Sequence, residues 1–278
     1  MARPYSWLEY PMTTLVTKTN EANSLELEAA DGLKSSSILL LWGGLCWWLE
    51  AEHKHSNRPP ISRKISNIAF AAATAIGAVI NPKTLVISAV HYAASILYSK
   101  KEGKRDFLGA TSFLVRGIGQ GALFFFSQYL YSPALNTRHF LMGLAVAGMT
   151  AARNLIGDLR DQKYDEKTFN KRFGERAGRF VASGLKLGAA AAVFFATGSV
   201  FVSAPLLIES VLSLVHKNNQ HLHRISVLGV SATLGNIVLA NIGLGAGMIL
   251  TNLLYVSGLL NIITYNMVPR ESNQDYNE

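Results

Sequence analysis

Long apolar segments separated by polar loops constrain this chain more than any other feature of its sequence. Of its 278 residues, 49% are hydrophobic and 16% are charged, which is apolar for a soluble protein. Several segments approach the roughly 20 residues that a helix needs to cross a bilayer. The apolar segments, of which the shorter ones gain length from their flanks, are residues 37–48, 65–80, 84–97, 107–130, 140–156, 180–198, 200–215, 225–242 and 246–267. The sequence therefore predicts an all-α fold, a polytopic membrane helix bundle that forms one domain over residues 1–278.

The connections between these segments alternate in charge. Lysines and arginines gather in loops 50–64, 99–106, 158–179 and 216–224, with seven of them in the third loop. The intervening connections, residues 81–83, 131–138, 197–199 and 243–245, are short and nearly uncharged. Because basic loops remain on the cytoplasmic side of a membrane, we expect the charged loops in the cytoplasm.

The two ends of the chain complete this topology. If a short apolar stretch at residues 7–16 spans or half-spans the membrane, the count is nine or ten transmembrane helices. Residues 17–33 then form a polar extracytoplasmic segment, and residues 268–278 form a polar tail. The net charge of +8 is explained by positive-inside loops and anionic lipid, so no nucleic-acid partner is expected.

Three aspartates with a DxxDxxxD spacing follow the apolar segment 140–156. Asp158, Asp161 and Asp165 share one helical face with Asn154, because offsets of three, four and seven residues converge on one side. Carboxylates grouped in this way suit Mg²⁺, which keeps some of its waters and binds substrate phosphates. The sequence thus indicates a magnesium–diphosphate site at the membrane surface. The alternative is a solvated helix end whose aspartates pair with nearby basic residues.

A second polar cluster ends the segment 37–48. Glu50 and Glu52 stand there, on the same side of the membrane as the aspartates, so either of them is a candidate metal ligand. The histidines beside them have a spacing that is too loose to indicate zinc. A cationic loop that contains Lys101 and Lys104 follows Tyr98 on this side. It suits phosphate binding, although positive-inside bias alone would also produce it.

Three basic residues lie inside apolar segments or at their ends. Charge within a membrane is costly, so each residue is a candidate functional site. Arg153, one turn before Asp158, is expected to hold a diphosphate or to neutralise the aspartates. Lys186 can reach the cytoplasmic surface by snorkelling. The sequence names no partner for Arg116. Two GxxxG patterns, in residues 117–121 and 243–247, indicate close helix packing.

The order of these features resembles the UbiA-type intramembrane prenyltransferase superfamily. That family carries an arginine, then DxxDxxxD, then a threonine-containing loop and a Gly-Glu pair. The residues that carry the resemblance are Arg3, Pro4, Trp7, Asn57, Arg58, Pro59, Tyr98, Arg153, Asp158, Asp161, Asp165, Thr168, Gly174 and Glu175. One departure concerns the family's first motif, NDxxDxxxD, because residues 46–54 contain no aspartate and offer only Glu50 and Glu52.

The resemblance implies a bundle around a central, lipid-accessible cavity in which two acidic motifs hold Mg²⁺ on the diphosphate of a prenyl donor. The implied metal ligands are Asp158, Asp161, Asp165, Glu50 and Glu52. The implied substrate-binding residues are Arg153, Asn154, Asn57, Arg58, Tyr98, Lys101 and Lys104. The resemblance also implies that apolar and aromatic side chains line the cavity, and the alternative for each aromatic residue is a place in the packed core or against lipid. The candidates are Phe124, Phe125, Phe126, Tyr129, Trp47, Trp48, Phe194 and Phe195.

Three functions follow from the resemblance. The first is a Mg²⁺-dependent prenyltransferase that moves a prenyl group from a prenyl diphosphate to an aromatic or lipid acceptor. The second is a terpene cyclase on the same fold, which needs no acceptor and is consistent with a reduced first motif. The third is a non-catalytic homologue that retains half of a site. A requirement for an acceptor separates the first two functions.

Overall fold

The fold is taken from a computed structural model that describes residues 16–19, 21, 29–52, 63–99, 106–160, 162 and 167–242. These residues form helices and connecting loops, and no strand occurs among them. The helices are α2 (Ala29–Glu52), α3 (Arg63–Ile80), α4 (Thr84–Ser99), α5 (Asp106–Tyr131), α6 (Thr137–Arg160), α7 (Phe169–Phe173), α8 (Glu175–Thr197), α9 (Val200–Val215) and α10 (Asn219–Ile242). The predicted segment 246–267 lies outside the described residues, as do most of residues 7–16.

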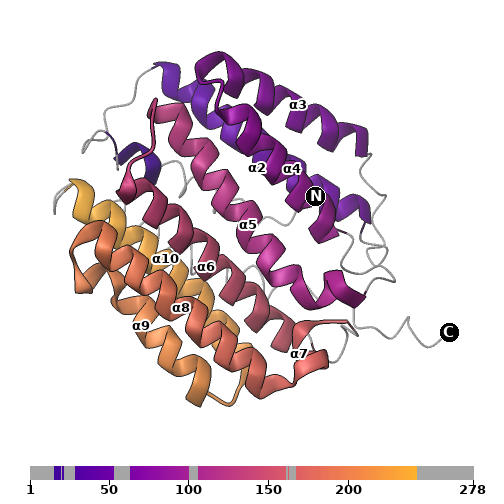
Figure 1. Ribbon diagram of the computed structural model, residues 1–278, viewed down its shortest axis with the longest axis vertical. Helices are drawn as coiled ribbons and strands as arrows, with labels where there is room; N and C mark the ends of the chain where they lie inside the picture. The colour runs from indigo at the N-terminus through magenta and orange to yellow at the C-terminus, as the bar shows by residue number, and fades with distance from the viewer. Residues whose placement is uncertain are drawn as a thin grey trace.

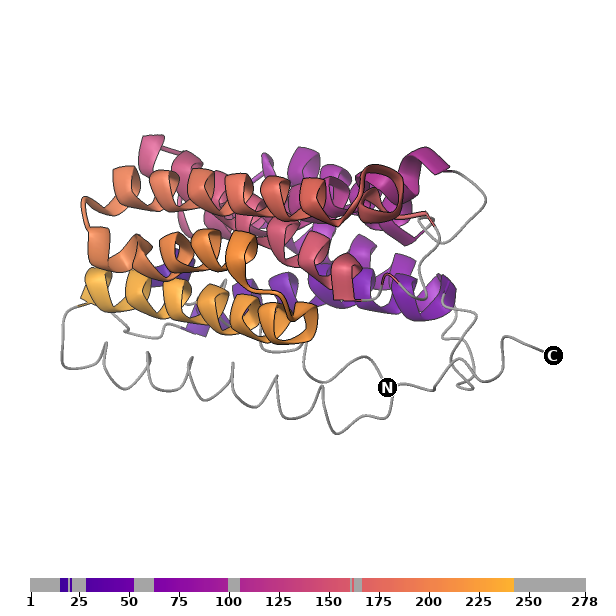
Figure 2. The same ribbon diagram turned by 90° about the horizontal axis from the view of Figure 1, so that it is seen from below.

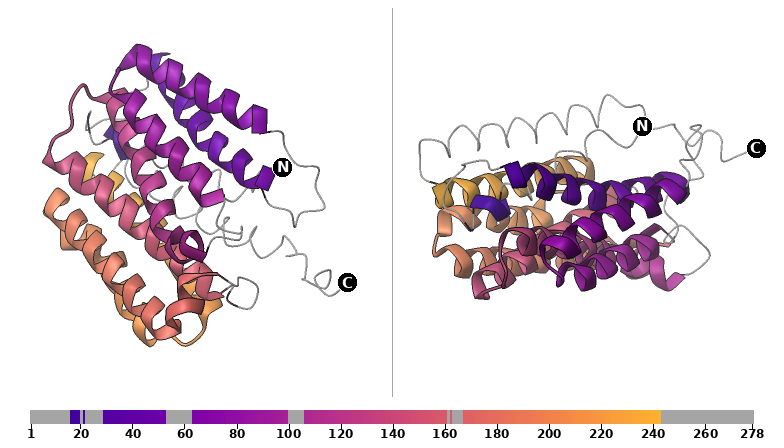
Figure 3. Two further views of the ribbon diagram at one scale, coloured as in Figure 1. Left: turned by 45° about the vertical axis from the view of Figure 1, so that its right-hand side comes forward. Right: turned by 90° about the horizontal axis from the view of Figure 1, so that it is seen from above.

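The long helices run side by side in two groups that meet in the middle of the molecule (Figure 1). Helices α2, α3, α4 and α5 pack against one another, and so do α6, α8, α9 and α10. The two groups are joined by extensive packing of α5 against α6. Figures 2 and 3 show the same separation, with the indigo to magenta helices on one side and the orange to yellow helices on the other. The predicted all-α polytopic bundle is confirmed.

The outer surface of the bundle is apolar. Within the described part of the chain, four helices are long and apolar enough to cross a membrane: Arg63–Ile80, Thr137–Arg160, Glu175–Thr197 and Asn219–Asn241. The helices α4 and α9 are apolar but shorter. Large apolar side chains point outward; Val79 is 87% exposed and Phe180 is 74% exposed. A soluble monomer rarely leaves so much apolar surface in water. The apolar helices and this surface point to an integral membrane protein.

Each helix group has its own buried core. One apolar cluster joins α2, α3, α4 and α5 around Trp42, Phe70 and Phe126. A second joins α6, α8, α9 and α10 to α5 around Phe124 and Met149, and a third joins α5, α6, α8 and α10 around Phe113 and Leu155. Because α5 contributes side chains to all three clusters, its interface with α6 fixes how the two groups sit relative to each other.

Small residues bring α5 and α6 close together. A Cβ atom on Gly117 would lie 2.6 Å from the Ala147 carbonyl oxygen, and one on Gly121 would lie 3.1 Å from the Ala147 side chain. A Cβ atom on Gly143 of α6 would lie 2.2 Å from the Phe125 ring. The prediction that the first GxxxG pattern serves helix packing is confirmed. The second pattern, in residues 243–247, lies outside the described residues.

The loops separate into two ends, as the charge alternation predicts. At the charged end the end of α4 meets the end of α6, where the Tyr98 hydroxyl donates to Asn154 Oδ1 at 3.0 Å. At the other end, the last turn of α3 meets the last turn of α5, where Asn81 Nδ2 donates to the Tyr129 carbonyl oxygen at 3.0 Å. Arg138 near the start of α6 bonds Asn241 near the end of α10 at this same end.

The polar segment predicted at residues 17–33 contributes to the end without charged loops. Its Thr17 hydroxyl lies 2.7 Å from that of Ser127 on α5, and Lys18 forms a buried ion pair with Asp31. Glu21 pairs with His139 on α6, with 2.8 Å between Oε1 and Nε2. Helix α2 begins at Ala29 inside this polar segment, eight residues before the apolar run at residue 37. The described residues of the segment are therefore tied into the bundle.

We predict that enlarging Gly117 separates α5 from α6. Because the Ala147 backbone cannot yield as a flexible side chain can, Gly117→Val should cost about 1–3 kcal/mol of stability through overpacking. The matched control is Gly184→Val on α8, where nothing lies within 4 Å of a Cβ atom. The measurement is the thermal unfolding midpoint in detergent, followed by the loss of monodisperse protein on gel filtration. Equal midpoints for the two variants would contradict this packing argument.

We also predict that the two ends face opposite sides of the membrane. In a Cys46→Ser background, a cysteine replaces either Lys83, in the loop before α4, or Lys171, in α7. The positive-inside bias places Lys171 in the cytoplasm, so a membrane-impermeant maleimide should label Lys83→Cys in intact cells. Lys171→Cys should be labelled only after permeabilisation. Labelling of both positions from the same side would overturn this topology.

Candidate functional site

The charged-loop end of the bundle brings together residues from α4, α5 and α6. Tyr98 stands in the last turn of α4 and reaches across to Asn154 of α6. The Asn154 amide group donates to the Thr150 carbonyl oxygen at 3.0 Å, which fixes its orientation. The Arg116 guanidinium of α5 lies over the Tyr98 ring, with its carbon 5.7 Å from the ring centroid. The predicted residues Tyr98 and Asn154 therefore do meet, and Arg116 lies beside them.

Asp158 lies in the last turn of α6, on the face predicted from its spacing. It lies one turn after Asn154, and its side chain is buried, with 5% of the residue exposed. Helix α6 continues only to Arg160, so the remaining two aspartates, Asp161 and Asp165, lie just outside the described residues. The described part of the aspartate motif thus starts at the end of α6 and on the side of Tyr98.

Several other predicted site residues lie outside the described part of the chain. These are Asn57, Arg58, Lys101 and Lys104. Glu50 and Glu52 fall in the last turn of α2, at the charged-loop end, but their side chains are not described. Among the described residues alone, no group of three or more histidine, cysteine, aspartate or glutamate side chains could hold a metal ion. The predicted metal set therefore depends mainly on residues beyond this part.

A buried ion pair lies within the second helix group. Lys186 of α8 and Glu209 of α9 approach to 2.6 Å between Nζ and Oε2, and their side chains are only 1% and 2% exposed. Gly229 of α10 makes room for the carboxylate, because a Cβ atom there would lie 1.5 Å from Glu209 Oε1. Lys186 is thus paired inside the bundle. The expectation that its side chain snorkels to the cytoplasmic surface is wrong.

The sequence analysis did not predict Glu209 as the partner of Lys186. An acidic residue inside the apolar segment 200–215 does indicate a basic partner within the membrane. Its carboxylate also experiences the positive charge of Arg153 on α6. Arg153 therefore stands toward the second helix group, whereas its neighbour Asn154 contacts α4. One turn of α6 presents polar side chains to both helix groups.

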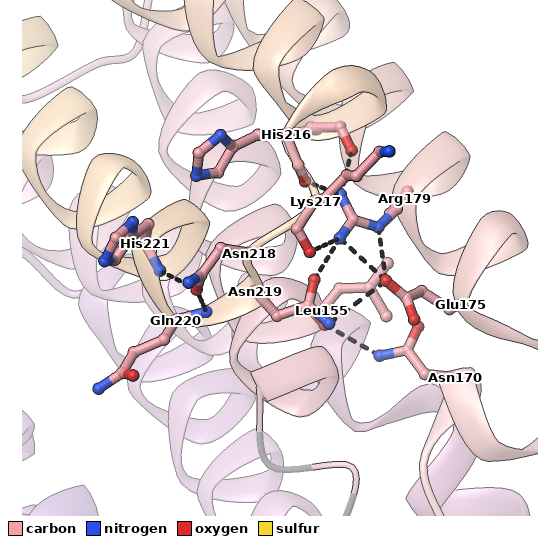
Figure 4. Close-up of polar contacts among 11 residues, drawn as sticks. Leu155, Asn170, Glu175, Arg179, His216, Lys217, Asn218, Asn219, Gln220 and His221 are labelled. Atoms are coloured by element: carbon pink, nitrogen blue, oxygen red, sulfur yellow. Dashed lines mark hydrogen bonds and ion pairs between the residues drawn. The ribbon is translucent and has the colours of Figure 1, made fainter.

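The glycine–glutamate pair that resembles the family motif braces helix ends. Gly174 has φ +86°, in the region that favours glycine, and it separates α7 from α8. Glu175 accepts from Arg179 Nε at 2.9 Å and from Asn219 Nδ2 at 3.3 Å (Figure 4). Arg179 also donates to the carbonyl oxygens of Ser213, His216 and Lys217, which closes the C-terminal end of α9. In the structure Glu175 thus stabilises the junction of α8, α9 and α10.

Asn170 of α7 extends this bracing toward the aspartate helix. Its Nδ2 atom donates to the Leu155 carbonyl oxygen of α6 at 3.0 Å (Figure 4). The side chain fits against Gly178 of α8, where a Cβ atom would lie 1.7 Å from Asn170 Oδ1. Thr168 caps α7 by accepting from the Lys171 backbone N–H at 3.4 Å. The short helix α7 therefore holds the loop after the aspartates against α6 and α8.

The aromatic residues considered as cavity walls occupy different places. Phe124 and Phe126 are fully buried in two of the apolar clusters. Phe195 is 73% exposed and belongs to the apolar outer surface. The side chains of Trp47 and Trp48 are not described. These aromatic side chains therefore serve packing and lipid contact where the structure describes them.

The comparisons with known proteins agree on the fold. No family model matches the sequence, and no curated protein is significantly similar to it. A solved UbiA homologue from Archaeoglobus fulgidus matches with a TM-score of 0.60 at 13% identity, covering 95% of this chain and 98% of that one. A UbiA homologue from Aeropyrum pernix matches with a TM-score of 0.59 at 15% identity, covering 96% and 100%.

A digeranylgeranylglyceryl phosphate synthase structure matches equally well, with a TM-score of 0.60 at 13% identity over 95% of this chain and 96% of that one. The Archaeoglobus homologue has also been solved with bound Cd²⁺, and that structure matches with a TM-score of 0.56 at 14% identity, covering 95% of this chain and 98% of that one. At this level of identity the likeness establishes the fold. The resemblance to the UbiA-type superfamily is confirmed to that extent, because the chain has the helical fold of the UbiA homologues.

We predict that Lys186 and Glu209 depend on each other. Removing one partner leaves a buried charge without compensation, so Lys186→Met or Glu209→Gln should each cost about 3–5 kcal/mol. The double variant Lys186→Met/Glu209→Gln should cost markedly less than the sum of the two single variants, because no charge remains buried. The measurement is a double-mutant cycle of unfolding in detergent. Single variants as stable as the wild type would show that the pair is dispensable.

Proposed function

We propose that this protein is a Mg²⁺-dependent intramembrane prenyltransferase, which moves a prenyl group from a prenyl diphosphate to an aromatic or lipid acceptor. One observation carries the proposal. In a bundle with the fold of UbiA homologues, the start of a DxxDxxxD motif lies beside Tyr98 and Asn154 at the charged-loop end. Carboxylates grouped at the membrane surface suit a diphosphate bound through a divalent cation.

The residues present suit Mg²⁺. Asp158 is a buried carboxylate in the last turns of α6, and hard oxygen ligands of this kind are the ones that Mg²⁺ prefers. Asp161 and Asp165 follow at motif spacing, and Glu50 and Glu52 end α2 at the same end of the bundle. These five residues would hold the metal. When bound, it supplies Lewis-acid stabilisation of the charge on the leaving diphosphate. The Cd²⁺-bound Archaeoglobus homologue supports a divalent cation in this fold.

The chemistry that we propose breaks the allylic C–O bond of the donor. The electron pair of that bond leaves with the diphosphate, and a prenyl cation remains. An electron pair of the acceptor then forms the new bond to the allylic carbon, and the acceptor loses a proton. Tyr98 and Asn154 orient the diphosphate end of the donor, while the apolar bundle below excludes water that would otherwise capture the cation.

The cationic residues of the site complete the proposal. We propose that the cationic side chains of Arg153, Arg58, Lys101 and Lys104, together with the neutral amide of Asn57, contact the diphosphate, with the positive loops facing the cytoplasm. The acceptor is proposed to be a lipid or an aromatic compound. The likeness in fold to a digeranylgeranylglyceryl phosphate synthase supports the lipid class.

A terpene cyclase is the second candidate function. It is favoured by the first acidic motif, where residues 46–54 contain two glutamates and no aspartate. A cyclase lets the double bonds of the donor capture its own cation, so it has no acceptor to bind. The two candidates share donor ionisation and differ only in what captures the cation.

The test is an assay of detergent-purified protein with prenyl diphosphates of ten to twenty carbons, in Mg²⁺ or in EDTA. Released diphosphate is measured, and organic products are identified by mass spectrometry. We expect release only with Mg²⁺ and an acceptor. Asp158→Asn should lower the rate by about 10²-fold or more, because it removes charge that holds the metal. The matched control is Glu21→Gln, a partly exposed carboxylate at the opposite end of the bundle, with both variants checked for folding.

The outcomes separate the candidates. Diphosphate release without an acceptor, together with a cyclic hydrocarbon or terpene alcohol, would establish the cyclase. Absence of Mg²⁺-dependent release from every donor, with phenolic acids and glycerol-based lipids as acceptors, would leave the non-catalytic homologue.

A further inference from the structure

Helix α5 presents one buried polar row that the aspartate motif does not account for. Arg116 and Gln120 stand one turn apart on the same face, and they are 8% and 4% exposed. The opposite face of α5 carries Leu114 and Ile118, which are 43% and 55% exposed on the apolar outer surface. The two polar side chains therefore point into the bundle, away from lipid.

The guanidinium of Arg116 lies beside Tyr98, a residue of the predicted site. Its Cα atom lies ten residues into α5, about 15 Å from the start of the helix at 1.5 Å per residue. Its guanidinium nevertheless reaches the Tyr98 ring, one residue from the end of α4. Tyr98 in turn bonds Asn154, one turn from Asp158. A guanidinium on the inner side of this cluster is suited to phosphate oxygens, because its fork of donors matches their geometry.

Gln120 lies one turn deeper, and its side chain needs a donor. The Gln120 Oε1 atom is fully buried and accepts no hydrogen bond from any described residue. A buried amide oxygen left in this state is costly, so a native protein usually pairs it with another group or a ligand. On α4, the Nδ1 atom of His91 bonds the Gly119 carbonyl oxygen at 2.7 Å, so this nitrogen is not available to Gln120. A hydroxyl group of a bound substrate would supply the missing donor.

From this geometry we propose that Arg116 and Gln120 form the inner wall of the substrate site. Arg116 binds a phosphate oxygen of the donor on the side away from the charged loops. Gln120 accepts a hydrogen bond from a hydroxyl group of the acceptor, one turn deeper, next to the allylic carbon. The proposal rests on the proposed function, and it restricts the acceptor to compounds with a hydroxyl group near the reacting atom.

The first test is equilibrium binding of inorganic diphosphate to the full-length protein in detergent, with Mg²⁺, by titration calorimetry. Arg116→Met keeps the apolar stem and removes the charge. It should weaken binding at least tenfold, and Arg116→Lys should recover part of the loss because a point charge lacks the fork. The control is Arg138→Met, which removes a positive charge at the opposite end and should bind like the wild type. Unchanged binding by Arg116→Met would overturn the proposal for Arg116.

A thermal unfolding midpoint for each variant separates binding from folding. If Arg116→Met does not fold, Arg116→Lys decides the question, because a purely structural arginine predicts wild-type affinity for diphosphate in any folded lysine variant. Reduced affinity in a folded Arg116→Lys supports the proposal.

The second test is kinetic and concerns Gln120. Gln120→Met should raise the KM for a hydroxylated acceptor several-fold while the diphosphate affinity and the donor KM stay unchanged. Equal effects on donor and acceptor, or a wild-type protein that needs no acceptor, would overturn the role of Gln120. The two proposals fail separately. A wild type that binds diphosphate through Arg116 but never releases it from a donor refutes only the proposed function. Turnover that is indifferent to Arg116→Met refutes only this inference.

Discussion

A hydrocarbon environment cannot solvate a charge, and this constraint decides where the polar side chains of the bundle lie. Lys186 and Glu209 show it most directly, because each is almost completely buried and each has the other as its partner at 2.6 Å. The charge of Arg179 is likewise paired, because its guanidinium donates hydrogen bonds to three carbonyl oxygens at the end of α9. Such a pair contributes little to the free energy of unfolding, yet removing one partner lowers it strongly because the other charge stays buried. The pair therefore fixes α8, α9 and α10 in a single register.

Helix α6 is the element on which both helix groups depend. Its small residues let α5 approach closely, and its core side chains pack against α8 and α10. Its last turns then present Asn154 to α4 and Arg153 toward α9. The aspartate motif follows directly from this shared helix. The proposed site at the end of α6 is consequently positioned by both groups, as the proposed reaction between two substrates would require.

Sequence reasoning reached the fold because apolar length and loop charge are averaged over many residues, and single errors do not change them. It also named Tyr98 and Asn154 as residues of one site, and the structure brings these two side chains into contact. It did not predict contacts that depend on a single residue from a distant part of the chain. Lys186 reads as a snorkelling side chain until Glu209, 23 positions later, is brought against it by the packing of α8 on α9. Likewise, no local pattern around Arg116 reveals that Tyr98 from another helix covers it.

The ion pair between α8 and α9 also has a consequence for how the protein is made. A charged residue near the centre of a helix adds about 2.5–3.5 kcal/mol to the cost of its insertion by the translocon. Lys186 and Glu209 would each impose this cost if their helices entered the bilayer one at a time. Only Gly198 and Ser199 separate the two helices, and Gly198 adopts φ +69°, which turns the chain back on itself. We expect α8 and α9 to partition into the membrane together as a helical hairpin, already neutralised.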